Sequence, residues 1–539
     1  MRAAQLAPSL ANVLSMDNRL RLTYRTQRHF MICLHKLAKL LGCAALLALP
    51  AAIPLRAQDA RAVIEASLAA INSQGMDSLQ VSGHGFDALF GQAYDGDSAW
   101  PRFALTRYRL SVSFKDSSLR EERTRVQLQN PPLGGGNQPI GEQHQTLLLS
   151  DGHAWSLDGK GAVVPSGLER DLRPAVDARQ LELLFTPQGF LKVALQTTAT
   201  ARNVKVAGKI ETVISFTLPN KYKVEGTLNA DGLIERVRTW VETPVLGDVI
   251  LDASFSGYSD FDGIRFPRHI VRSEGGYPLL DLTVTSVKQN TVEPIVVPQN
   301  IQKTTVKPTS TIKPEPYGEG IWILPGEDYH ASKSIVAEFK DYLLVVEAPD
   351  SEERSLAVIE AARKLVPGKP IRYVINTHTH FDHSGGLRTY AAEGVTIVTW
   401  EGNIPYYRQV WSNPHSISPD RLALSRQAPV FEGIVGSRTF SDGEQEVVVY
   451  HYAGNFHNPG MLAIYLPKQR AIIEADSFNP LPNPDEPPTA IPNLIQFYEA
   501  VDRLGLAVDQ VIPIHGRIAP FEEGRKDVEA YKGSQLGQQ

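Results

Sequence analysis

Cysteine is nearly missing from this sequence. Cys33 and Cys43 are the only two, and both lie near the start of the chain. Beyond residue 43, the sequence therefore excludes a disulfide framework and a thiolate metal ligand. Stability there must come from buried apolar cores, and any bound metal must be held by imidazole and carboxylate groups.

An excess of one charge is also missing. The chain has 54 lysines and arginines against 59 aspartates and glutamates, which gives a net charge of −5. Nucleic-acid-binding domains usually carry a basic face, so we expect no nucleic-acid partner.

The shares of hydrophobic residues, 42%, and charged residues, 21%, are ordinary for a folded soluble protein. The length of 539 residues predicts two or three domains.

A hydrophobic run long enough to cross a membrane is absent as well. The run at residues 40–55 is broken by two prolines and is shorter than the roughly 20 apolar residues of a membrane span. Two lysines in residues 32–39 precede it, and Ala57 offers a small residue for cleavage, which is typical of a signal peptide. We therefore expect residues 1–57 to be an N-terminal extension with a signal peptide. The mature protein is then periplasmic or secreted, without a transmembrane span; the alternative is an uncleaved anchor.

Residues 58–295 show the pattern of a β-rich domain. Tyr108–Phe114 alternates apolar and polar side chains, as a half-buried strand does. Asp-Gly pairs recur, and strands separated by such turns form antiparallel meanders. One helix is expected near residues 59–73. The stretch YSDFDGIRFPRHIVRSEG resembles a hairpin of lipoprotein-carrier-like periplasmic domains. This resemblance implies a curved antiparallel sheet and, as a hypothesis, binding of a lipid or another apolar ligand.

The composition changes near residue 296. Residues 296–318 are rich in proline, threonine and lysine without periodicity, which is typical of a linker. Residues 319–533 then alternate apolar strands, such as Ile371–Ile375, with helical stretches such as Ser351–Leu365. This alternation indicates an α/β domain, with Ser351 where a helix N-cap is expected.

Four potential metal ligands follow the strand Ile371–Ile375 within six positions. The stretch THTHFDHSGG contains His378, His380, Asp382 and His383. The first two histidines point the same way in an extended segment, and the other two residues come after the chain turns. One loop therefore offers two imidazoles to one metal ion, and a carboxylate and an imidazole to a second. A solvated polar turn is the alternative, but this cluster follows an apolar strand directly and leads into two glycines.

Three further candidates lie next to later strands. His457 stands in a loop before a strand, Asp476 ends an apolar strand, and His515 ends another. Since strand ends gather at one rim of a sheet, all three can join the first loop. His451 is the rival of His457, but it lies inside an alternating strand, which favours a structural role.

The motifs HxHxDH, GNFHNPG, EAD and PIHG, in this order, closely resemble those of the metallo-β-lactamase superfamily over residues 318–530. The resemblance implies an α/β fold, the αββα sandwich, with two metal ions at one edge. It assigns the first ion to His378, His380 and His457, the second to Asp382, His383 and His515, and a bridging position to Asp476. Ala475 and Asn458 stand where many members have glycine and threonine, and neither change removes a ligand. Two zinc ions per chain are implied, with iron or manganese as alternatives.

These ligands predict a hydrolase. A metal lowers the pKa of bound water to about 7, and Asp382 is the candidate catalytic residue that orients the nucleophile and relays its proton. We expect an exported enzyme that uses a dizinc-activated hydroxide to cleave an ester, thioester, lactone or amide-type bond of a small molecule. The missing cysteine argues against the lactamase branch with a thiolate ligand. The alternatives are an iron-dependent oxidoreductase resembling persulfide dioxygenases, a phosphodiesterase, and a non-catalytic binding protein.

Two loops are candidates for choosing the substrate. Gly402–Pro429 carries Tyr406, Tyr407 and Trp411, and either tyrosine is a candidate donor to an oxyanion, as in lactonase relatives. Ser477–Pro492 follows the last carboxylate ligand and is rich in proline, which limits motion. We expect it to wall the pocket, and an ordinary surface loop is the alternative.

Overall fold

The computed structural model describes residues 55–536, except 129–131, 136–141, 170, 220–221, 304–311, 327–331, 426 and 481–490. Most of the predicted signal peptide and of the predicted pocket wall therefore lies outside the described residues. Gln58–Ala201 and Thr212–Gln539 form one compact unit. The other unit contains residues 55–57 of β1 (Leu55–Gln58) and the turn at Ala207 and Gly208 between β8 (Thr200–Val206) and β9 (Lys209–Thr217).

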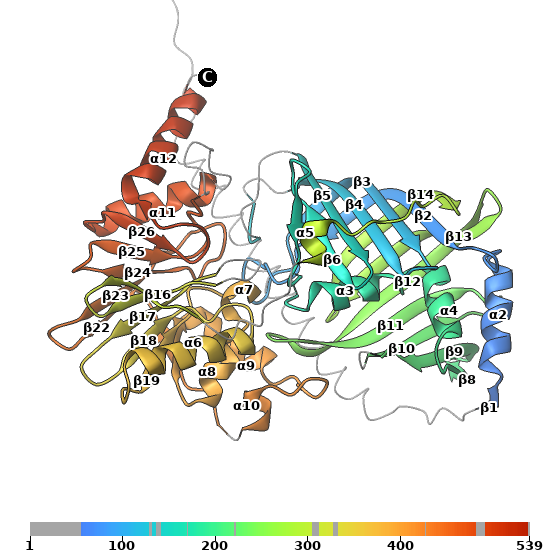
Figure 1. Ribbon diagram of the computed structural model, residues 1–539, viewed down its shortest axis with the longest axis horizontal. Coiled ribbons are helices and arrows are strands. Elements are labelled where there is room, and N and C mark those ends of the chain that lie inside the picture. The colour runs from blue at the N-terminus through green and yellow to red at the C-terminus, as the bar shows by residue number, and fades with distance from the viewer. Residues whose placement is uncertain are drawn as a thin grey trace, which may run out of the picture. The chain divides into compact units, whose positions relative to one another are not determined.

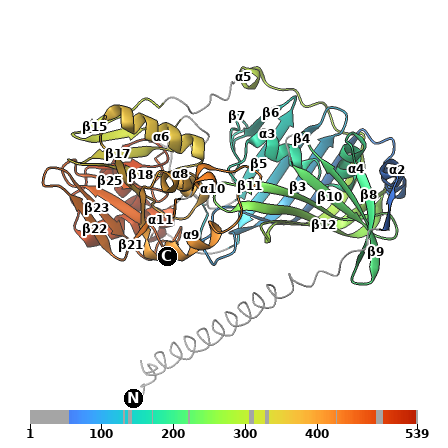
Figure 2. The same cartoon turned by 90° about the horizontal axis from the view of Figure 1, so that it is seen from below.

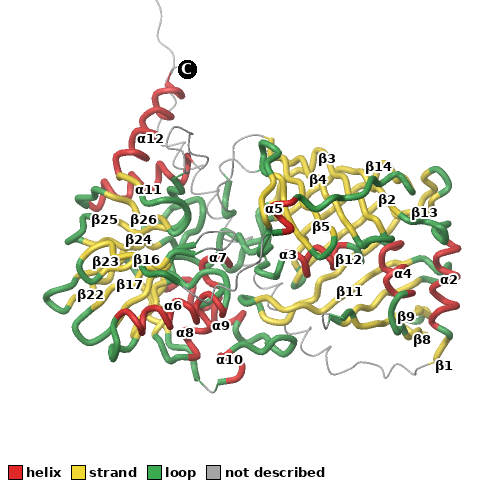
Figure 3. Tube along the Cα trace, viewed as in Figure 1, coloured by secondary structure: helices red, strands yellow, loops and turns green. Residues whose placement is uncertain are grey.

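A large antiparallel sheet fills the first part of the main unit (Figures 1 and 3). Beside β9 its strands follow in the spatial order β10 (Lys223–Leu228), β11 (Ile234–Thr243), β12 (Gly247–Phe261), β13 (Ile264–Glu274), β14 (Tyr277–Gln289), β2 (Ser78–Ala88), β3 (Arg102–Ser113), β4 (Ser118–Gln127), β5 (Glu142–Ser150), β6 (His153–Leu157) and β7 (Val163–Pro165). Every neighbouring pair from β9 to β7 is antiparallel. The expected hairpin is the pair β12 and β13. The sheet confirms the predicted β-rich antiparallel region.

Three helices pack on this sheet: α2 (Ala60–Ala70), α3 (Ala175–Glu182) and α4 (Pro187–Leu195). The first is the helix expected near residues 59–73. It begins after Asp59, whose carboxylate accepts a hydrogen bond from the backbone N–H of Arg61 at 3.0 Å. Leu68 of α2 and Phe190 of α4 share a buried core with Ile234 of β11. Burial of such side chains holds the helices on the sheet.

The loop between β2 and β3 is long. The last pair in their ladder joins Ala88 to Arg102, so residues 89–101 leave the sheet. Phe90 and Trp100 remain buried, and their ring centroids lie 4.9 Å apart. This aromatic contact fixes the base of the loop.

Two smaller sheets form the later part of the chain (Figures 1 and 2). The first contains β15 (Glu315–Gly318), β16 (Ile321–Leu324), β17 (Ser334–Glu338), β18 (Leu343–Val346), β19 (Ile371–Ile375), β20 (Thr396–Trp400) and β21 (Phe431–Ile434), in this order and parallel from β18 onward. The second contains β22 (Ser437–Ser441), β23 (Glu446–His451), β24 (Leu462–Leu466), β25 (Ala471–Glu474), β26 (Gln510–Pro513) and β27 (Ala519–Pro520), where only β25 and β26 are parallel. One buried core joins the two sheets.

Helices lie on the outer faces of both sheets. They are α6 (Glu352–Leu365), α8 (Leu387–Ala392), the 3-10 helix η1 (Glu401–Asn403), α9 (Ile404–Val410), α10 (Arg421–Leu424), α11 (Ile491–Leu504) and α12 (Phe521–Leu536). The short helix α7 (Phe381–Ser384) lies in the loop after β19, and its Phe381 packs with the core of the large sheet. Val358 of α6 and Tyr390 of α8 pack against Val345 of the first sheet. On the second sheet, Phe497 of α11 packs with Ile472. The predicted αββα sandwich is confirmed.

Regular structure also occurs within the predicted linker, residues 296–318. A short helix, α5 (Gln299–Gln302), lies in its first half, and β15 at its end pairs with β16 of the sandwich. The domain boundaries drawn from the sequence stay predictions. Among the helices that the structure describes, none has the length and apolar character needed to span a membrane.

Candidate metal centre

The loop after β19 is held in shape by Asn376, a buried residue. Its side-chain amide donates to the carbonyl oxygens of His378, at 2.7 Å, and of His383, at 3.1 Å, so both ends of the loop are tied together. The glycine pair that follows has a steric reason. A Cβ on Gly385 would lie 2.0 Å from the carbonyl oxygen of Asp350, so the chain can pass only without a side chain here.

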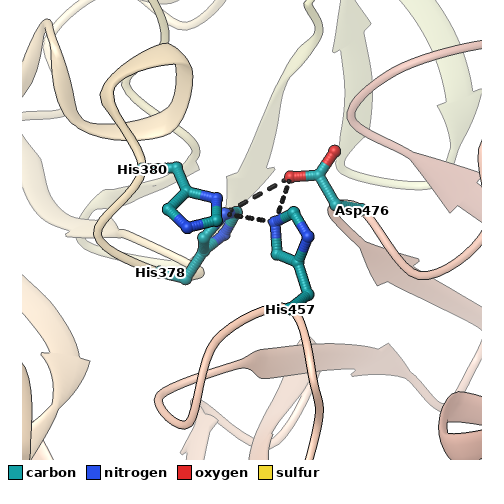
Figure 4. A group of neighbouring side chains, drawn as sticks. All are labelled: His378, His380, His457 and Asp476. Carbon is teal, nitrogen blue, oxygen red and sulfur yellow. Dashed lines mark hydrogen bonds and ion pairs between the residues drawn. The ribbon is translucent and has the colours of Figure 1, made fainter. Parts of the chain in front are cut away.

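Figure 4 shows the first group of candidate ligands, in which three imidazoles and a carboxylate gather around one point. Nε2 of His378 and Nε2 of His457 lie 3.1 Å apart, and they lie 3.3 Å and 3.1 Å from Oδ2 of Asp476. His380 completes this first group, and the four ligand atoms all lie within 4.8 Å of one another. The structure thus brings together, in buried positions, the three histidines that were predicted to hold one metal ion.

The second group consists of Asp382, His383, Asp476 and His515. Nε2 of His383 lies 2.9 Å from Oδ2 of Asp476 and 3.0 Å from Nε2 of His515. Oδ2 of Asp382 lies 3.5 Å from Nε2 of His515. Since Asp476 belongs to both groups, it stands where the bridging ligand was expected.

The site meets solvent on the side of the second group. The side chains of Asp382 and His515 are 15% and 14% exposed, whereas the other five candidate ligands are buried. A small molecule would therefore meet Asp382 and His515 first.

His380 has only one nitrogen available to a metal. Its Nε2 lies 2.9 Å from the carbonyl oxygen of Ala93. Because a carbonyl oxygen only accepts, Nε2 must carry the proton, and the neutral ring keeps its lone pair on Nδ1. That Nδ1 atom is buried without a hydrogen-bond partner. A contact of this kind fixes the tautomer and the ring orientation of a metal-ligating histidine.

Glu347 fixes the orientation of two more histidines, although it belongs to none of the sequence motifs. Its Oε2 lies 3.2 Å from Nδ1 of His383 and also accepts the hydroxyl proton of Thr377. That hydroxyl in turn accepts from Nδ1 of His378 at 3.1 Å. Both imidazoles therefore turn their Nε2 lone pairs toward Asp476.

The backbone of Glu347 shows that this arrangement is costly. Its φ is +92°, a region that non-glycine residues rarely adopt and that costs roughly 1–3 kcal/mol. The side chain is fully buried. One signal was available in the sequence, because Glu347 directly follows the apolar strand β18, just as Asp476 comes shortly after β25.

The carboxylates and imidazoles of the cluster shift one another's pKa values. Burial alone would raise the pKa of Asp476 and of Asp382, but neighbouring imidazoles, His383 first, hold both pKa values well below the usual range. Burial lowers the pKa of His378 to about 3, with a further contribution from His383. By contrast, Asp476 and Asp382 outweigh burial at His383 and raise its pKa. The carboxylates are thus ionised, as metal ligation requires.

This donor set fits a divalent metal ion. Zinc lies about 2.0–2.2 Å from nitrogen and oxygen ligands, which places neighbouring tetrahedral ligands roughly 3.3–3.6 Å apart. Oδ2 of Asp476 lies 2.9 to 3.3 Å from the Nε2 atoms of His378, His383 and His457, close to this range. Two imidazole lone pairs this close repel each other unless a cation or a proton lies between them. Imidazole and carboxylate suit zinc, iron and manganese.

A cavity of about 170 Å³ lies beside the metal loop, which is the segment from His378 to His383. Its walls include His380, Trp100, Tyr277, Tyr406 and Val410. The two tyrosines of the aromatic loop therefore differ. Tyr406 lines the cavity, whereas Tyr407 is buried and its hydroxyl donates to Oδ1 of Asn376 at 2.6 Å.

His451, the rival of His457, lies outside both groups. Its ring stacks on Trp400 with centroids 5.1 Å apart, and its Nε2 donates to the carbonyl oxygen of Pro459 at 2.7 Å. Both contacts are structural, as its position inside a strand predicted.

Comparison with known families identifies the part of the chain that carries these ligands. Residues 330–508 match the family model described as the metallo-beta-lactamase superfamily, and the match includes every clustered ligand except His515. This part of the chain belongs to the metallo-β-lactamase superfamily. A bound divalent metal is therefore implied by the superfamily as well as by the donor set.

Individual relatives of this metallo-β-lactamase region are distant. A linear primary-alkylsulfatase from a Pseudomonas species is 28% identical over 109 residues, which cover 20% of this chain and only 16% of that enzyme. Among solved structures, a metallo-β-lactamase from Pontibacter korlensis is 18% identical, with 41% of this chain and 98% of that one aligned at a TM-score of 0.33. The flavodiiron core Flv1 from Synechocystis is 12% identical, with 43% and 63% aligned at a TM-score of 0.35.

Proposed function

We propose that this protein is a metal-dependent hydrolase that holds two zinc ions per chain and cleaves an ester, thioester, lactone or amide-type bond of a small molecule. The observation that carries the proposal is the pair of ligand groups that share Asp476. The first ion would be held by His378, His380 and His457, and the second by Asp382, His383 and His515, with Asp476 between them. Superfamily membership supports the general class of reaction.

The ligands define what each residue contributes. Two zinc ions would supply Lewis acidity and make water a strong nucleophile near neutral pH. Asp382, at the exposed edge of the second group, would orient the attacking water and take its proton. Buried His378, His380 and His457 would exclude bulk water from the inner side of the site. Glu347 would hold His383 and, through Thr377, His378 in the ligating orientation.

The bond to be cleaved is tested by a hydrolysis screen on the purified zinc form, with metal content measured on the same sample. The screen contains β-lactams, lactones, thioesters and phosphodiesters, and a long-chain alkyl sulfate because of the 28% identity to an alkylsulfatase. We expect two zinc ions per chain and turnover of one carbonyl-containing class. One iron per chain with oxygen consumption and no hydrolysis would replace the proposal by an oxidoreductase.

We also propose that the protein is exported to the periplasm or beyond. The support is the order of basic, apolar and small residues before residue 58, together with the confinement of both cysteines to that segment. Intact-mass measurement of the protein recovered from its natural host tests this directly. A mature chain that starts near Gln58 is expected, and an intact N-terminus would contradict it.

A further inference from the structure

The long loop between β2 and β3 forms hydrogen bonds to the metal loop through three consecutive residues. The carbonyl oxygen of Gly91 accepts from the backbone N–H of Phe381 at 3.2 Å. Nε2 of Gln92 donates to Oδ1 of Asp382 at 2.8 Å, and the carbonyl oxygen of Ala93 accepts from Nε2 of His380 at 2.9 Å. The segment Gly91–Ala93 therefore contacts three consecutive residues of the metal loop, and two of these are candidate ligands.

Further backbone hydrogen bonds hold the segment Gly91–Ala93 in place. The carbonyl oxygen of Gln92 accepts from the backbone N–H of Gly135 at 2.7 Å, and the backbone N–H of Gly134 donates to the carbonyl oxygen of Phe456, next to His457, at 2.9 Å. Gln92 itself is buried, with 4% of its surface exposed. The β-rich domain thus touches the metal loop and the loop that precedes the third histidine.

Steric fit points to the same close approach. Gly91 has a φ of +77°, and a Cβ there would lie 2.8 Å from the ring of Phe381. That ring cannot move aside, because it is buried between Phe90 and Trp100, with centroids at 5.3 Å and 5.8 Å. Glycine is therefore the residue that lets the two segments of the chain approach each other at this point.

We infer that Gln92 is a positioning residue of the metal centre, supplied by the β-rich domain, which holds the carboxylate of Asp382 for the second metal ion. The inference rests on the proposed function, since it presupposes two bound metals. Oδ1 of Asp382 is occupied by the Gln92 amide, which turns Oδ2 toward His383 and His515, at 3.8 Å and 3.5 Å. The role of the β-rich domain is then to complete the centre, in addition to any ligand it binds itself.

The test is stepwise metal binding by the full chain. Gln92→Met is nearly isosteric but cannot donate, and Gln92→Ala serves as a second variant with a different packing change. Zinc affinity is measured by competition with a chromophoric chelator, and the visible absorption of the cobalt-loaded protein reports the ligand geometry. Gln188→Ala is the matched control, because Gln188 is a buried glutamine of the same domain that donates to Ser73 at 3.2 Å, far from the metal loop in its contacts.

We expect both Gln92 variants to weaken the second zinc ion about 10- to 100-fold and to change the cobalt spectrum of that site. The first zinc ion should bind as in the wild type, and the Gln188 variant should bind both ions normally even if it unfolds at lower temperature. Unchanged binding of both ions by the Gln92 variants would overturn the inference and leave the proposed function intact. Equal weakening of both ions would also overturn it, because the effect would not be specific to Asp382. A wild-type chain that binds no metal would overturn the inference and the proposed function together.

Discussion

Oε2 of Glu347 lies 3.2 Å from Nδ1 of His383, a residue 36 positions further along the chain. The same carboxylate accepts the Thr377 hydroxyl that orients His378. Glu347→Gln would place an amide N–H against one of these donors, so at least one imidazole would lose its orientation. We expect metal affinity to fall about 10- to 100-fold, as measured by chelator competition.

A buried carboxylate far from the metal loop provides the control. Glu121 is 1% exposed and is paired with Arg123 at 2.9 Å. Glu121→Gln should reduce stability without changing metal affinity. If both variants bound metal like the wild type, the orienting role of Glu347 would be wrong.

Asp382 is the candidate ligand with both an exposed edge and an expected catalytic role. Asp382→Ala should lose the second metal ion and most of the activity, because His383, His515 and the shared Asp476 remain without their fourth partner. The first ion should stay, since the first group does not contain Asp382. Metal analysis and turnover on one sample decide this. Two metals per chain with full turnover would remove Asp382 from the site.

His457 and His451 form a natural pair of test and control. His457→Ala removes a buried ligand of the first group, so the first metal ion should bind at least tenfold more weakly. His451→Ala removes a stacking contact with Trp400 and a hydrogen bond to Pro459, which should cost stability but no metal. Metal content and urea unfolding measured on both variants separate the two roles. Loss of metal in the His451 variant alone would reverse the assignment.

The fold was largely accessible from local patterns. The apolar stretch Ile371–Ile375 is β19 with the same bounds, and Ser351 caps α6 by accepting from the backbone N–H of Arg354 at 3.3 Å. Hydrophobic periodicity and helix capping depend on a few neighbouring residues, so both can be detected in a single sequence. The pairing of β14 with β2 was not accessible, because it joins strands about 200 residues apart.

The candidate site was likewise predicted only in part from the sequence. The seven candidate ligands lie next to strands at motif spacing, and the structure gathers all seven into two groups with one shared member. Glu347 and Gln92 were missed because each acts through a contact that spacing does not encode. Gln92 lies 290 positions from Asp382 in the chain, and only the packing of the two loops brings them together.

A second buried charge cluster, inside the β-rich domain, predicts a dependence of stability on pH. Glu274 is 1% exposed and lies 3.2 Å from Arg173, which is also paired with Asp171. Arg272 nearby is already paired with Glu182. Burial therefore raises the pKa of Glu274 to about 7, and Asp171 adds to the effect that Arg173 opposes.

The folded-state pKa of Glu274 thus lies above the value of about 4.3 for an exposed glutamate. Between these two pH values the folded chain binds more protons than the unfolded chain, so this residue makes stability fall as the pH rises from about 4.5 to 7. Glu274→Gln imitates the protonated form and should remove this slope. The difference in free energy of unfolding between the variant and the wild type should therefore shift by roughly 3 kcal/mol in favour of the variant from pH 5 to pH 8.

Urea unfolding of both proteins at pH 5 and pH 8 measures the difference, and the metal centre contributes equally to both. Glu121→Gln is the control, because Arg123 and Arg272 outweigh burial at Glu121 and lower its pKa. Its stability relative to the wild type should therefore change only below the ordinary glutamate pKa of about 4.3, and the difference should be the same at pH 5 and at pH 8. An equal gain from pH 5 to pH 8 in both variants would show that the raised pKa of Glu274 is wrong.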